Sequence, residues 1–124
     1  MVRITSRVAD VAYLLLRLVA ALLFAEHGLQ KLFGVLGASR MPLMSEFGLA
    51  GVIELAAGLM VAFGVFPRWA ALVASGEMAV AYLTKHAPQG FWPARNHGEL
   101  AVLYCFIFLY IAARGGGKLT VTRD

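Results

Sequence analysis

The stretch that decides the fold is VAYLLLRLVAALLFAEHGLQKLF, residues 11–33. It is long enough to cross a bilayer, because a spanning helix needs about 20 mostly apolar residues. Polar residues nevertheless gather near its end: Glu26, His27, Gln30 and Lys31. An ionisable side chain at membrane depth costs at least about 2.5 kcal/mol, so such residues usually mark a functional site. The stretch therefore predicts a transmembrane helix that carries a polar site.

Composition extends this interpretation to the whole chain of 124 residues, of which 60% are hydrophobic and 15% charged. These values are typical of an integral membrane protein. We expect four transmembrane helices, at residues 11–33, 47–65, 69–84 and 93–113. The connections are short and contain Gly and Pro, which favours antiparallel neighbours. The predicted fold is all-α: one domain, residues 1–124, forming an antiparallel four-helix transmembrane bundle.

The distribution of cations predicts the orientation of the bundle. An even number of crossings puts both termini on one side, together with the following cations: Arg3, Arg7, Arg68, Arg114, Lys118 and Arg123. The other side has fewer: Lys31, Arg40, Lys85 and Arg95. The positive-inside rule then places both termini in the cytoplasm. Because this bias explains most of the basic character, we expect no nucleic-acid partner, and residues 115–124 are expected to form a cytoplasmic tail.

Each expected helix contains one glutamate: Glu26, Glu54, Glu77 and Glu99. At a rise of about 1.5 Å per residue, all of them lie about 9 to 12 Å below the outer surface. His27, Lys31, Lys85 and His97 fall near the same level. Glu54 and Glu77 also lie on small-residue faces, which let membrane helices approach closely. The pattern predicts an outward-opening polar pocket, floored by apolar and aromatic side chains such as Phe106.

Several of these polar residues also have simpler interpretations. Arg17 can extend back to the cytoplasmic interface, so we expect it outside the site. His86 is expected in a loop. Lys31 could pair with Glu54 or Glu26, or anchor its helix at the interface. For Glu54 and Glu77, hydrogen bonding that merely holds helices together is the alternative to chemistry.

Metal binding is the other chemistry that a layer of carboxylates and histidines can perform. Di-iron bundles use Glu-x-x-His pairs on two helices. Here Glu26 and His27 are adjacent, and His97 precedes Glu99 by two residues. We therefore expect no metal site.

Several motifs stand out by their order and spacing: Gly28-x-x-Lys31-Leu32, Glu54 followed by Gly58 and by Gly64 before Arg68, Met78-x-x-Ala81, and Asn96-His97-Gly98-Glu99. In these motifs the chain resembles the DoxX family of small four-helix membrane proteins. The resemblance covers nearly the whole chain. It implies a protein of the bacterial inner membrane that is linked to quinone-dependent oxidoreductases, with quinone or quinol as its ligand.

Two main functions fit these features. In the first, a quinone-linked redox component, Glu54 and Glu77 are the catalytic proton-exchanging residues, and the residues that bind the ligand are Glu26, His27, Lys31, His97 and Glu99. In the second, a non-catalytic binding or assembly subunit, the polar layer holds the bundle together and docks a partner. A small proton-coupled carrier is a third, less favoured function. The sequence does not decide whether the protein is an enzyme; its expected partners are the lipid bilayer, a soluble or membrane redox protein, and further copies of itself.

Overall fold

The computed structural model describes residues 2–123, and its regular elements in this range are all helical. The longer helices are α1 (Val2–Phe33), α2 (Glu46–Phe63), α3 (Pro67–Ala81) and α5 (Glu99–Arg114). Three short elements connect α3 to α5: a π-helical turn η1 (Tyr82–His86), a 3-10 turn η2 (Ala87–Gln89) and α4 (Pro93–Asn96). The prediction of an all-α fold is confirmed.

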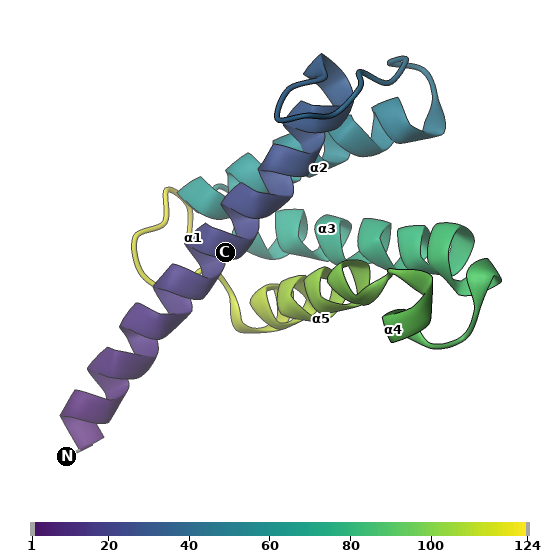
Figure 1. Ribbon diagram of the computed structural model, residues 1–124. Coiled ribbons are helices and arrows are strands. Elements are labelled where there is room, and N and C mark those ends of the chain that lie inside the picture. The colour runs from purple at the N-terminus through teal and green to yellow at the C-terminus, as the bar shows by residue number, and fades with distance from the viewer. Residues whose placement is uncertain (1, 124) are drawn as a thin grey trace.

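The long helices form two pairs. Helix α1 packs along α2, α3 packs along α5, and contacts between α2 and α3 join the two pairs. Figure 1 shows α1 crossing the α3–α5 pair at an angle instead of running beside it. The backbones of α1 and α5 approach each other at few positions, and the two helices meet mainly through aromatic side chains, such as Phe24 against Phe108.

Helix α1 begins earlier than predicted, at Val2 instead of residue 11. No proline or glycine lies between these positions, and extending an existing helix costs much less than starting one. The N-terminal part of α1 projects away from the other helices (Figure 1), and the side chains of residues 5–12 are largely exposed. Tyr13 is the first buried residue in this part of the chain.

The predicted single helix at residues 93–113 is wrong, because the chain breaks between α4 and α5. His97 ends α4 in the left-handed conformation, with φ of 62°. The Asn96 side chain holds the break: its Oδ1 accepts the Gly98 N–H at 2.8 Å, and its Nδ2 donates to the Gly90 carbonyl at 2.8 Å. Asn96 itself is buried. The break takes His97 out of the helical register.

Helix α2 starts and ends with recognisable caps. The Ser45 hydroxyl accepts the Gly48 N–H at 3.1 Å, as an N-cap serine does. Gly64 ends the helix with φ of 74°, a conformation that favours glycine. Both boundaries, Glu46 and Phe63, lie within two residues of the predicted 47 and 65.

Two segments are long and apolar enough to cross a membrane: Thr5–Phe33 and α2. Helices α3 and α5 contain 15 and 16 residues, which is short of the about 20 that a straight crossing needs. All four helices nevertheless carry exposed large apolar side chains, for example Leu15, Leu59, Leu72 and Leu109. Such an apolar outer surface fits contact with lipid.

The prediction that Arg17 extends to the interface is wrong, because Arg17 is only 1% exposed. Its guanidinium donates four hydrogen bonds, to the carbonyls of Gly116 (2.7 Å), Lys118 (2.7 Å), Leu119 (2.9 Å) and Ala62 (3.1 Å). Three of these acceptors lie in the C-terminal segment. Arg17 therefore fastens the folded-back tail to the ends of the helices.

Candidate functional site

A cavity of about 530 Å³ lies at the end of the molecule opposite the tail. We call it the polar cavity. Its polar lining comes from α1, α2, η1, η2 and the break before α5: His27, Lys31, Glu54, Lys85, His86, Gln89 and His97. The rest of its lining is apolar or aromatic: Phe24, Phe47, Met78, Ala81, Leu100, Ala101 and Tyr104. Four residues predicted for the site, His27, Lys31, Glu54 and His97, thus lie around one space.

An ion pair between α1 and α2 forms one wall of the polar cavity. Lys31 Nζ lies 2.5 Å from Glu54 Oε2. The Glu54 side chain is 1% exposed and that of Lys31 is 27% exposed. Helices α1 and α2 approach each other closely here, which helps to place this pair. A Cβ added to Gly28, one turn before Lys31, would lie only 2.5 Å from a backbone nitrogen of α2, so only glycine allows this approach. Of the interpretations considered for Lys31, the structure shows pairing with Glu54.

Glu77 approaches the same pair from α3. It is half-buried, and its carboxyl group lies close enough to the Glu54 carboxyl for the two groups to interact. Glu54 Oε1 and Glu77 Oε2 are both buried and have no hydrogen-bond partner. Glu77 does not line the polar cavity; it lines a smaller one of about 220 Å³ between α2 and α3, which we call the side cavity. The two carboxyl groups thus meet between two cavities.

Aromatic side chains form the inner end of the polar cavity. The ring of Phe24 lies 5.4 Å from that of Tyr104, and the His27 imidazole meets Tyr104 edge-on at 6.0 Å. Phe106 does not take part, since it is 63% exposed on the outer face of α5. The expectation that Phe106 floors the pocket is therefore wrong, and Tyr104, two residues earlier, occupies that place.

Two predicted site residues lie apart from this group. Glu26 and Glu99 are exposed, and neither lines the polar cavity. Glu26 precedes His27 by one residue, so it points about 100° away around the helix. Glu99 begins α5 after the break, which leaves its side chain on the outside. Equal depth in the membrane was therefore not enough to bring all four glutamates together.

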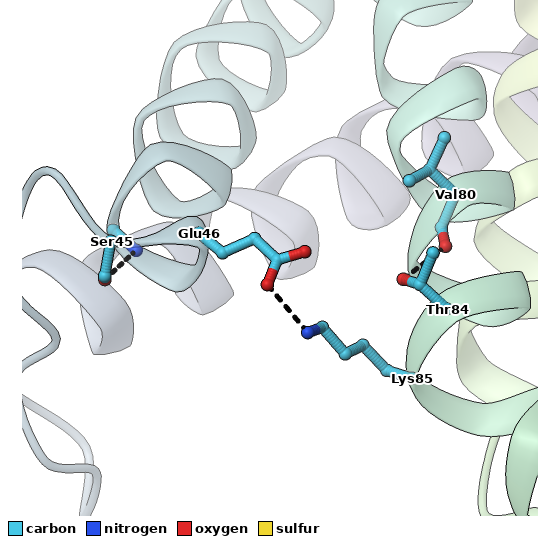
Figure 2. Close-up of polar contacts among 6 residues, drawn as sticks. Ser45, Glu46, Val80, Thr84 and Lys85 are labelled. Carbon is cyan, nitrogen blue, oxygen red and sulfur yellow. Dashed lines mark hydrogen bonds and ion pairs between the residues drawn. The ribbon is translucent and has the colours of Figure 1, made fainter.

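The sequence analysis did not assign two basic residues of the polar cavity, Lys85 and His86, to the site. Lys85 pairs with Glu46 at 2.8 Å, across from the start of α2 (Figure 2), and its ammonium lies 5.0 Å from the centre of the Phe47 ring. His86, expected in a loop, lies in η1, where its Nδ1 is 3.1 Å from the Asn96 carbonyl oxygen. The helical continuation beyond residue 84 positions both side chains. π-helical turns of this kind occur frequently at functional sites.

Within residues 2–123, no three His, Cys, Asp or Glu side chains come together as a metal-binding group. The polar cavity instead combines one buried ion pair, several imidazoles and an aromatic floor. Such a lining suits a ligand with a polar, hydrogen-bonding ring.

Comparison with known proteins places this architecture in a family. The sequence model of the DoxX family matches residues 12–87, which include α1 from Ala12, α2, α3 and η1. An uncharacterised protein of Haemophilus influenzae is 40% identical, and the aligned region covers 82% of this chain and 81% of that relative. No solved structure gives a significant match. With an all-helical fold, an apolar outer surface and a match over more than half its length, the chain belongs to the DoxX family of membrane proteins.

Proposed function

We propose that this protein is an inner-membrane component of a quinone-linked oxidoreductase system, and that its polar cavity binds the head group of a quinone-like ligand. The supporting observation is that an apolar groove of about 390 Å³ lies next to the polar cavity. The groove runs between α1 and α5, and Leu100 and Tyr104 line both spaces.

The lining of the groove suits a hydrocarbon chain. Apart from Tyr104, its residues are aliphatic: Ala12, Leu15, Leu16, Val19, Ala20, Leu23, Leu100, Leu103 and Ile107. A membrane-soluble ligand with a polar ring and a long apolar tail can place the ring in the polar cavity and the tail in the groove. Mostly apolar sites with a few placed polar groups are typical of small-molecule binding.

The polar groups offer the contacts that quinone reduction needs. His27, Lys31 or His97 can donate a hydrogen bond to a quinone carbonyl oxygen, and Glu54 or Glu77 can supply a proton. Reduction to quinol consumes two electrons and two protons. The electrons would come from a soluble or membrane redox partner.

For this function we infer four membrane crossings. Helix α3 continues through η1 and η2 to Gln89, and α4 and α5 together span residues 93–114. Each of these combined segments is about as long as a crossing requires. We infer that both termini are cytoplasmic, because the cation bias favours that side, so that the polar cavity opens toward the outer face of the bacterial plasma membrane.

This orientation predicts the accessibility of single cysteines at Ser39 and Ser6. In a Cys105→Ala background, a membrane-impermeant thiol reagent added outside intact cells should label Ser39→Cys but not Ser6→Cys. Both positions are exposed in the structure, so permeabilised cells should label both and serve as the control. Labelling of Ser6→Cys alone in intact cells would show the opposite orientation, with the polar cavity facing the cytoplasm.

The proposed ligand can be tested with the purified protein. We expect it to carry a lipid-soluble compound that absorbs ultraviolet light and exchanges with an added short-chain quinone. His27→Phe should weaken this exchange at least tenfold, because it removes a hydrogen-bonding group of the cavity, which corresponds to about 1.4 kcal/mol. Arg40→Gln, in the exposed loop between α1 and α2, should have no effect. A quinone that neither binds nor exchanges would contradict the proposal.

The alternative is a non-catalytic membrane subunit whose polar layer holds the helices together and docks a partner. The observation that favours it is the ion pair between Lys31 and Glu54, which joins α1 to α2. The same ion pair would serve both functions. Absence of quinone binding together with co-purification of a defined redox protein would favour the alternative.

A further inference from the structure

Two cavities approach each other at the Lys31–Glu54 ion pair. Lys31 and Lys85 line both the polar cavity and the side cavity. Each of the two glutamates lines only one of these cavities: Glu54 lines the polar cavity, and Glu77 lines the side cavity. The adjoining carboxyl groups of Glu54 and Glu77 therefore separate one space from the other.

The hydrogen bonding of this carboxyl pair is incomplete when both groups are ionised. Glu54 Oε2 accepts a hydrogen bond from Lys31, but Glu54 Oε1 and Glu77 Oε2 are buried without a partner. An ionised carboxylate can only accept hydrogen bonds, and two adjacent negative charges repel each other. A protonated carboxyl group gains a donor. One added proton would therefore relieve both the missing hydrogen bond and the repulsion.

We propose that Glu54 and Glu77 share one proton and form a relay that connects the side cavity with the polar cavity. With one shared proton, the cation of Lys31 balances the single remaining negative charge. Such neutrality matters because uncompensated charge is costly in a poorly hydrated interior. The other titratable groups around the pair are Tyr104 and the histidines of the polar cavity, His27, His86 and His97, together with Lys85, which lines both cavities, and Glu46 of the side cavity.

This inference rests on the proposed function for its role in catalysis. When the partner supplies electrons to a bound quinone, the Glu54 carboxyl group gives its proton to a quinone oxygen. Both groups are then carboxylates, and Glu77 takes a new proton from water that reaches the side cavity and shares it with Glu54, which restores the single proton of the pair. A second passage supplies the second proton of the quinol, so each quinol formed consumes two protons and the two electrons of the partner.

Infrared spectroscopy of the full-length protein at neutral pH tests the shared proton directly. The wild type should show the carbonyl stretch of a protonated carboxyl group, and this band should shift in heavy water. Glu77→Gln and Glu54→Gln should each abolish it, because the amide donates to the remaining carboxylate and Lys31 keeps that carboxylate ionised. Glu46→Gln, which changes an exposed glutamate of the side cavity, should keep the band.

Glu77→Asp provides a second variant that keeps a carboxyl group at this position, and it should retain the band even if Glu77→Gln folds poorly. A wild type without the band, or a band unchanged in both glutamine variants, would overturn the shared proton.

Quinone binding separates this inference from the proposed function. Glu77→Gln should still bind the quinone, since Glu77 lies outside the polar cavity, but electron-coupled proton uptake should slow by about 100-fold. Quinone binding without the infrared band would overturn the relay and leave the proposed function intact. The band without quinone binding would support the shared proton and overturn the proposed function. Unchanged proton uptake in Glu77→Gln would overturn the relay even if the band is lost.

Discussion

Replacing Lys31 by methionine should lower the free energy of unfolding by about 3–5 kcal/mol, because it leaves a buried carboxylate without its cation. The Glu54 side chain is 1% exposed and lies beside a second carboxyl group, that of Glu77, so water screens its charge poorly. Methionine keeps the length of the side chain and its apolar contacts. Unfolding of the purified protein by increasing fractions of sodium dodecyl sulfate in mixed micelles measures the difference.

The chain contains a matched control for this prediction. Lys85 and Glu46 also form a lysine–glutamate pair between neighbouring elements, but the side chains are 37% and 70% exposed. Lys85→Met should therefore cost only about 0–1 kcal/mol. The double variant Lys31→Met/Glu54→Met should recover most of the loss, since it removes both charges together. Equal costs for Lys31→Met and Lys85→Met would contradict the buried ion pair.

Arg17→Met should release the C-terminal segment and destabilise the protein by about 3 kcal/mol, because four hydrogen bonds from a charged donor disappear, two of them buried and two partly buried. Methionine fills part of the same space but offers no donor to the carbonyls of Gly116, Lys118 and Leu119. The same mixed-micelle unfolding measures stability. Limited trypsin digestion should cut after Lys118 faster in the variant than in the wild type.

Arg7→Met is the control for this change, because Arg7 lies on the exposed N-terminal part of α1. It should affect neither stability nor cleavage. A tail that stays protected from trypsin in Arg17→Met would show that other contacts suffice, such as the bond from the Tyr13 hydroxyl to the Gly115 carbonyl at 2.5 Å.

Apolar runs and helical periodicity were sufficient to predict the parts of the fold that depend on local sequence. The limits of α2 agree with the apolar run at residues 47–65, and the inward direction of Glu54 follows from the small residues on its stripe, Ala50 and Gly58. The sequence left several partners open for Lys31, and Glu54 was one of them. The pairing with Glu54 depends on the close contact of α1 with α2, which fixes the rotation of both helices.

The failed expectations depend on contacts between residues far apart in the chain. The environment of Arg17 is created by carbonyls about 100 positions later, which the periodicity of α1 cannot indicate. The break at His97 depends on the Asn96 side chain replacing helical hydrogen bonds. Phe106 was placed on the helical face of Glu99, seven residues earlier. Both residues are exposed on α5, and Tyr104 takes the place predicted for Phe106.

Photo-crosslinking with a photoreactive quinone analogue tests most directly whether the polar cavity binds a quinone head group. After irradiation of the purified protein, mass spectrometry of its peptides identifies the labelled residues. We expect labelling in residues 24–31 and 97–104, which contribute to the polar cavity from α1 and from the start of α5, and an excess of unlabelled quinone should suppress it. Labelling confined to the outer surface, for example at the exposed Trp69 and Phe106, and unaffected by the competitor would contradict the account.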